Sequence, residues 1–207
     1  MLITRVITAL IAIPTTLLAI IYLPPLYFSV VVALFILVGA WEWSSLLNVT
    51  AFSARMTYVI LVALGILFSA WILVLPLLLI ALCIWLWALF AILHYQKNGA
   101  GAGLHLPRMR AIVGWILSIA TWVSIVTLRI QPQFGVAWLI LMLLIVWAAD
   151  VGGYFAGRFF GKKNLCSRVS PKKTWAGFFG GLLLSVMIAA IYAVFLKLSA
   201  EKYFLLL

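Results

Sequence analysis

The stretch GVAWLILMLLIVWAADVGGYFAG, residues 135–157, decides the fold class, because a single charged residue, Asp150, interrupts an otherwise uncharged, mostly apolar run. A transmembrane helix needs about 20 predominantly apolar residues to cross a bilayer. Similar runs recur along the chain, and 68% of the 207 residues are hydrophobic while only 8% are charged. A soluble domain is about one quarter charged, so this composition cannot cover a surface that faces water. We therefore predict an all-α polytopic membrane protein.

The hydrophobic runs predict seven transmembrane helices in a single transmembrane domain, residues 1–207. Prolines mark several of the turns between them, because the residue before a proline avoids the helical region. The predicted spans are residues 6–23, 26–47, 56–75, 77–93, 111–130, 135–157 and 175–198, with a basic loop at residues 158–174. The apolar residues 203–207 are too few to span a bilayer. We expect that they begin an eighth helix at which the chain is cut; an interfacial chain end is the alternative.

The basic residues predict the orientation of the chain in the membrane. With the N-terminus in the cytosol, 11 of the 14 Lys and Arg residues fall in cytosolic segments and 3 on the opposite side, as the positive-inside rule requires. The basic loop is then cytosolic. A net charge of +11 could also suggest nucleic acid, but topology accounts for the charge, so we expect no nucleic-acid partner.

Two of the three acids lie inside predicted spans, where ionisable residues are candidates for function. The helical rise places Asp150 about 8 Å beneath the cytosolic boundary and Glu42 at a similar depth. Each could instead pair only with a basic residue or a backbone group. Glu42 lies between Trp41 and Trp43, so it could also be an interfacial anchor. We favour a functional role for Asp150 and a structural one for Glu42.

Glycines follow Asp150 at short intervals. Adjacent glycines weaken a helix but let its backbone approach a ligand or another helix closely. Gly153, Gly157 and Gly161 recur every four residues, and Gly177 and Gly181 share that spacing. Such spacing is typical of close helix packing, which we favour over ligand contact.

The basic loop ends in the string SPKKTW, residues 170–175, directly before the last predicted span. A polyphosphate is bound by fixed cations, hydroxyl donors and the backbone N–H groups at a helix start. The string offers all three, since Thr174 is placed to cap the helix. Attraction to anionic lipid headgroups or simple topology could produce the same charge. Neither would need Ser, Pro and Thr in this order, so we favour phosphate binding.

At these residues the chain resembles the bacterial phosphatidate cytidylyltransferase family, the CDP-diacylglycerol synthases. The resemblance rests on residues 150–154, Gly157, Gly161-Lys162 and the string SPKKTWAG at 170–177, with residues 41–43 similar as well. It implies a nucleotidyltransferase of phospholipid biosynthesis, multi-pass in the bacterial inner (plasma) membrane. Such an enzyme joins CTP and phosphatidic acid with Mg²⁺, giving CDP-diacylglycerol and pyrophosphate.

The resemblance also implies roles for individual residues. Asp150 would be a catalytic residue and a metal ligand. The substrate phosphates would be bound by Ser170, Lys172, Lys173 and Thr174, with Glu42, Gly152, Gly153, Tyr154 and Gly177 in support. The family's C-terminal signature, with further acidic metal ligands, would lie beyond Leu207, so we expect the isolated chain to be incomplete for catalysis. A homodimer is compatible with the sequence, which does not fix the oligomeric state.

A second class of function fits the same residues. A non-enzymatic transporter or scaffold could use the basic loop to bind anionic membrane lipids. Substitution of the lysines would then weaken binding to acidic lipids in general, with no preference for CTP.

Overall fold

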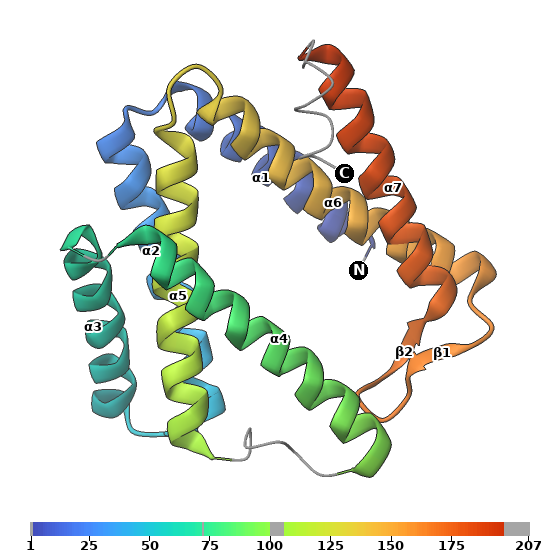
Figure 1. The fold of residues 1–207 in the computed structure, drawn as a ribbon, viewed down its shortest axis with the longest axis horizontal. Helices are drawn as coiled ribbons and strands as arrows, with labels where there is room; N and C mark the ends of the chain where they lie inside the picture. The colour runs from blue at the N-terminus through green and yellow to red at the C-terminus, as the bar shows by residue number, and fades with distance from the viewer. Residues whose placement is uncertain (1, 72, 100–105, 197–207) are drawn as a thin grey trace. The chain divides into compact units, whose positions relative to one another are not determined.

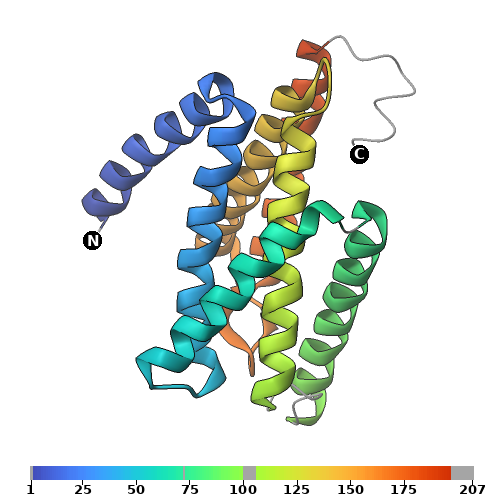
Figure 2. The same ribbon diagram turned by 90° about the vertical axis from the view of Figure 1, so that its left-hand side faces the viewer.

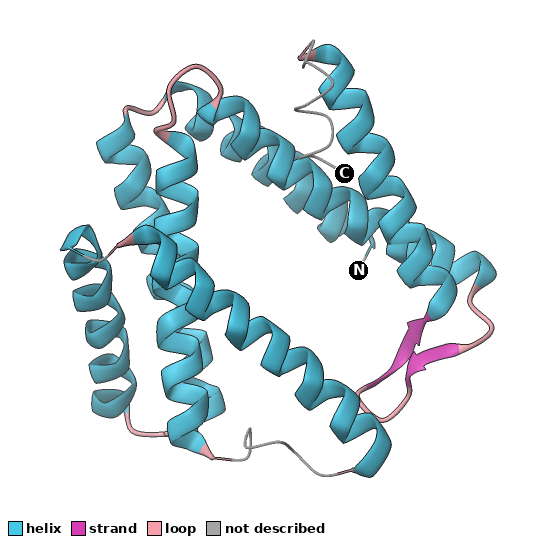
Figure 3. Ribbon diagram, viewed as in Figure 1, coloured by secondary structure: helices cyan, strands magenta, loops and turns pink. Residues whose placement is uncertain are grey.

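Helices dominate the computed structural model, which describes residues 2–71, 73–99 and 106–196 (Figure 1). The helices are α1 Leu2–Tyr22, α2 Pro25–Ser44, α3 Phe52–Phe68, α4 Val74–Asn98, α5 Pro107–Arg129, α6 Gly135–Phe160 and α7 Trp175–Phe195. The 3₁₀ turns η1, Ser45–Leu47, and η2, Ser69–Trp71, follow α2 and α3. A hairpin of β1, Asn164–Cys166, and β2, Ser170–Thr174, joins α6 to α7 (Figure 3). The predicted all-α polytopic class is confirmed.

Five segments are long and apolar enough to cross a membrane. They are α2 with η1, α4, α5, α6 and α7. Residues 10–22 of α1 and the 17 residues of α3 form shorter apolar helices. The predicted third span, 56–75, is therefore wrong at both ends, because α3 begins at Phe52 and gives way to η2 after Phe68. The crossing of the bilayer by α1 and α3 and the cytosolic N-terminus stay predictions.

Polar residues and prolines explain the other differences from the predicted boundaries. Pro76, which separates the predicted spans 56–75 and 77–93, lies in the first turn of α4, where proline is tolerated. Helix α4 continues beyond its apolar run to Asn98, and Gly99 follows with a φ of +73°. Pro107 starts α5, since proline suits the first helical positions. The predicted last boundary at 198 and the expected eighth helix fall in residues 197–207, outside the described residues.

The described helices pack into two compact units. The first comprises residues 1–94 and 100–136, and the second comprises residues 95–99 and 137–207. The single transmembrane domain expected from the sequence stays a prediction.

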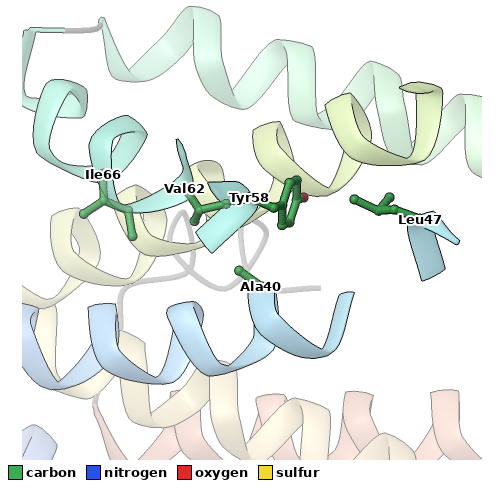
Figure 4. Close-up of a cluster of buried hydrophobic side chains, with 5 residues drawn as sticks. All are labelled: Ala40, Leu47, Tyr58, Val62 and Ile66. Carbon is green, nitrogen blue, oxygen red and sulfur yellow. The ribbon is translucent and has the colours of Figure 1, made fainter. Parts of the chain in front are cut away.

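In the first unit α2, α3 and α5 lie side by side (Figure 2). Buried side chains of α2, η1 and α3 form the cluster of Ala40, Leu47, Tyr58, Val62 and Ile66 (Figure 4), and Ala111 and Trp122 of α5 pack against it. Small residues let the helices approach, because a Cβ on Gly65 would collide with Ile119 and one on Gly114 with the indole of Trp43. Close contact through small residues is how helices associate in lipid, where burial of apolar surface gives little driving force.

The second unit is built on close packing of α6 against α7. A Cβ on Gly152 would lie 2.5 Å from the Gly180 carbonyl oxygen, and one on Gly181 would lie 2.8 Å from the Ala149 oxygen. The hydroxyl of Tyr192 donates to the Ala137 carbonyl oxygen at 3.0 Å. The predicted role in helix packing is confirmed for Gly177 and Gly181 of α7, because a Cβ on Gly177 would also lie 2.9 Å from the Gly153 carbonyl oxygen. Helix α6 runs unbroken through Gly152 and Gly153.

Candidate functional site

The predicted basic loop, residues 158–174, begins within α6, which continues to Phe160, and the rest contains a hairpin with a bulge in its second strand. Asn164 pairs with Thr174 and Cys166 with Ser170, so residues 171–173 of β2 lie opposite the single residue Leu165. A β-bulge leaves its extra residues outside the ladder, and a proline without an N–H group is tolerated there. Lys172 and Lys173 occupy this bulge, and both side chains are exposed. The bulge therefore presents two adjacent ammonium groups to the surroundings.

Thr174 fastens the base of the hairpin to both helices of the unit. Its hydroxyl oxygen accepts the backbone N–H of Gly177 at 3.2 Å, which confirms the predicted N-cap of α7. A Cβ on Gly157 would lie 3.3 Å from that oxygen, and one on Gly161 would lie 2.8 Å from it. The half-buried Thr174 thus sits in a space that glycines leave open at the end of α6.

The start of α7 has little free capacity for an anion. The N–H of Trp175 donates to the Lys163 carbonyl oxygen at 3.1 Å, and the N–H of Gly177 donates to Thr174. Two of the first three N–H groups of α7 therefore have protein partners. An anion bound here would depend mainly on the lysines of the bulge, with Ser170, which is half-buried at the start of β2.

Asp150, Tyr154 and Arg158 form a stripe on α6. Their spacing of four residues places them on one face of the helix. Arg158 donates through Nη1 to the Tyr154 hydroxyl at 2.7 Å, and all three side chains are exposed. Asp150 makes no ion pair with any residue that the structure describes, so the pairing considered from the sequence is not seen there. In the sequence Arg158 is marked only by its spacing of four residues from Tyr154.

Glu42 lies in the first unit, whereas Asp150 lies in the second. Its side chain is exposed on α2 and forms no ion pair with the described residues. The neighbouring tryptophans are anchored: Trp43 Nε1 donates to the Arg110 carbonyl oxygen at 3.0 Å, and the Arg55 guanidinium stacks 4.0 Å above the Trp41 ring. An equal depth for Glu42 and Asp150 stays a prediction.

Positive charge dominates the second unit. Its described residues include seven Lys and Arg residues and one acid, Asp150. Exposed aromatic rings flank the hairpin, with Phe155 stacked on Phe159 in α6 and Trp175 stacked on Phe179 in α7. Tryptophan and tyrosine are enriched at membrane–water interfaces, and among these four rings Trp175 is the one of that kind. The hairpin thus combines exposed cations with exposed aromatic rings beside it.

The carboxylates of the described residues do not form a metal site by themselves. No group of three or more His, Cys, Asp or Glu side chains gathers among them. Mg²⁺, however, is commonly held by one or two carboxylates together with substrate phosphates and water. The exposed Asp150 fits that second kind of site.

Comparisons with known proteins give the chain its relatives. Residues 3–207 match the model of the cytidylyltransferase family. The chain is 33% identical over 180 residues to a Pseudomonas aeruginosa protein named phosphatidate cytidylyltransferase. This alignment covers 86% of the chain and 65% of that protein. A Haemophilus influenzae protein of the same name is 29% identical over 211 residues, 92% of this chain and 72% of that protein. The chain thus spans just under two thirds of the length of the first relative.

Proposed function

The chain belongs to the cytidylyltransferase family, and on that premise we propose that it acts in the transfer of a cytidylyl group from CTP to phosphatidic acid. The products are CDP-diacylglycerol and pyrophosphate, and the place is the inner membrane of a bacterium. The names of the relatives support this reaction. The observation that carries the proposal is the bulge that presents Lys172 and Lys173 at the start of a membrane helix.

The reaction needs neutralisation of negative charge between two anionic substrates. An oxygen of the phosphatidic acid phosphate attacks the α-phosphorus of CTP, the bond from that phosphorus to the bridging oxygen breaks, and pyrophosphate leaves. Catalysis of phosphoryl transfer is largely positioning and electrostatic stabilisation. Lys172 and Lys173 would bind the phosphates of the nucleotide, while Ser170 would donate a hydrogen bond. Mg²⁺, held by Asp150 with phosphate oxygens and water, would neutralise charge that develops on the phosphates.

The experiment compares two lysine pairs that differ in position but not in charge. Lys172→Ala/Lys173→Ala removes the pair on the bulge, and Lys162→Ala/Lys163→Ala removes an exposed pair between α6 and β1. Binding of CTP to the chain is measured in nanodiscs of neutral phosphatidylcholine. We expect the bulge variant to bind CTP at least about tenfold more weakly, since a hydrogen bond to a charged group contributes about 1.5–3 kcal/mol. The control pair should change affinity about threefold or less, through screened long-range charge alone.

Binding to vesicles that contain phosphatidic acid or another anionic lipid separates the transporter or scaffold alternative. A generic polybasic surface would lose lipid binding equally with either lysine pair and would show no preference for CTP. That result, or a bulge variant with unchanged affinity for CTP, would reject the proposed function.

A further inference from the structure

The tip of the hairpin is fastened to the end of α4, far away in the sequence. Its turn, residues 167–169, meets the segment Tyr95–Gly99, which belongs to the same compact unit. The side-chain oxygen of Gln96 accepts the backbone N–H of Arg168 at 2.9 Å, and its nitrogen donates to the Ser167 hydroxyl at 3.3 Å. One amide side chain therefore holds two successive residues of the turn.

Arg168 adds a second contact to the same helix end. Its Nη1 donates to the Lys97 carbonyl oxygen at 3.0 Å. The last carbonyl groups of a helix have no partner within the helix, and a cation there also interacts favourably with the helix dipole. Gly99, in the left-handed conformation, lets the chain turn away, and its N–H donates to the Tyr95 carbonyl oxygen at 2.8 Å. The helix end and the turn thus complete each other's hydrogen bonds.

The hairpin has two attachments, and the lysine bulge lies between them. At the base Thr174 caps α7. At the tip Gln96 of α4 binds the turn, and Arg168 of the turn binds the Lys97 carbonyl oxygen of α4. Between them, no ion pair holds Lys172 or Lys173 among the residues that the structure describes. Like charges repel one another, so the hydrogen bonds at the two ends of the hairpin, those of Gln96 among them, oppose the separation of the cations on β2.

From these contacts we infer that Gln96 is a positioning residue, which fixes the hairpin so that Lys172 and Lys173 meet the phosphates of the nucleotide together. This inference rests on the proposed function. Because Gln96 carries no charge, its removal leaves the attraction of the site for an anion unchanged. Removal of Gln96 instead increases the conformational freedom of the bulge. This added freedom must be lost when the nucleotide binds, so the affinity falls.

The experiment combines a spectroscopic readout of the hairpin with nucleotide binding. A spin label is attached at Val169→Cys, an exposed residue of the turn, in a chain whose two native cysteines are replaced by Cys83→Ser and Cys166→Ser. Gln96→Ala should increase the mobility of the label and weaken CTP binding about three- to tenfold, as expected for the loss of hydrogen bonds that contribute about 1 kcal/mol. Gln96→Glu keeps the acceptor for the Arg168 N–H and should restore an immobile label. Lys97→Gln keeps the backbone carbonyl that Arg168 binds and is the control.

The outcomes distinguish this inference from the function on which it rests. A label that stays immobile in Gln96→Ala overturns the role of Gln96, even if CTP binding weakens. A mobile label with unchanged CTP affinity also overturns it, while the proposed function stands if Lys172→Ala/Lys173→Ala abolishes binding. A parent chain that does not bind CTP refutes the proposed function and the positioning role with it. The inference is supported if Gln96→Ala increases the mobility of the label and weakens CTP binding, and if the label is immobile again in Gln96→Glu.

Discussion

Replacing Gly152 by alanine should force α6 and α7 apart directly beside Asp150. The added Cβ would lie 2.5 Å from the Gly180 carbonyl oxygen and 3.0 Å from Leu184 Cβ. Neither atom is the end of a flexible side chain, so no rotamer change relieves the contact. Ordinary van der Waals contact begins at 3.4 Å, and interiors are close-packed, so the helices must separate by about 0.9 Å.

The size of the effect follows from two opposing terms. Overpacking costs about 1–3 kcal/mol, whereas alanine favours a helix interior by about 1 kcal/mol relative to glycine. Gly39 of α2 provides the control, because nothing lies within 4 Å of a Cβ at that position. Gly39→Ala should therefore gain only the stability that comes from the higher helix propensity of alanine. The two variants make the same chemical change and should differ by the packing term of about 1–3 kcal/mol.

Thermal unfolding of the chain in detergent micelles, followed by tryptophan fluorescence, measures the difference. A free energy of about 1 kcal/mol shifts Tm by about 2–4 °C in a protein of this size. We expect Gly39→Ala to melt at or above the parent Tm and Gly152→Ala to melt at least about 2 °C below Gly39→Ala. A Gly152→Ala variant as stable as Gly39→Ala would show that α6 and α7 do not pack closely at Gly152.

Three further predictions concern the cap, an anchor and the acid. Thr174→Ala should lower the stability by about 1 kcal/mol, whereas Thr174→Ser keeps the cap; equal Tm values for the two variants would contradict this. Arg55→Lys removes the stacking on Trp41 and the 2.8 Å bond to the Ser44 hydroxyl, so it should lower Tm, and an unchanged Tm would disprove that anchor. Asp150→Asn should abolish the increase in CTP affinity that Mg²⁺ produces, while affinity in EDTA stays unchanged; a full Mg²⁺ response in the variant would remove Asp150 from the metal site.

The apolar runs predicted the helices well because burial in lipid leaves a strong compositional signature. The end of α1 before Pro24-Pro25 and the capping of α7 by Thr174 were readable for local reasons. Proline restricts the residue that precedes it, and a threonine before an apolar run is a helix start. The polar extension of α4 to Asn98 was missed, since helix formation there does not follow hydrophobicity.

The candidate site was only partly readable from the sequence. The string SPKKT gave the lysines and the hydroxyls, but a short strand with a proline and two lysines lacks the alternation that predicts a strand. The bulge has no local signal in the sequence. The attachment of the turn to Gln96 has none either, because Gln96 is separated from its two partners by 71 and 72 positions in the chain. Tertiary contacts of this kind are fixed by the fold and not by spacing.

The most direct test of the account measures contact between the lysines and the phosphates. Dipolar coupling between lysine ¹⁵Nζ and the ³¹P of bound CTP can be recorded by solid-state NMR on the lipid-embedded chain. We predict strong coupling in the parent and its loss in Lys172→Arg/Lys173→Arg, which keeps both charges but carries no lysine Nζ on the bulge. Coupling that is absent in the parent, or that persists in this variant, would contradict the claim that the hairpin bulge binds the nucleotide.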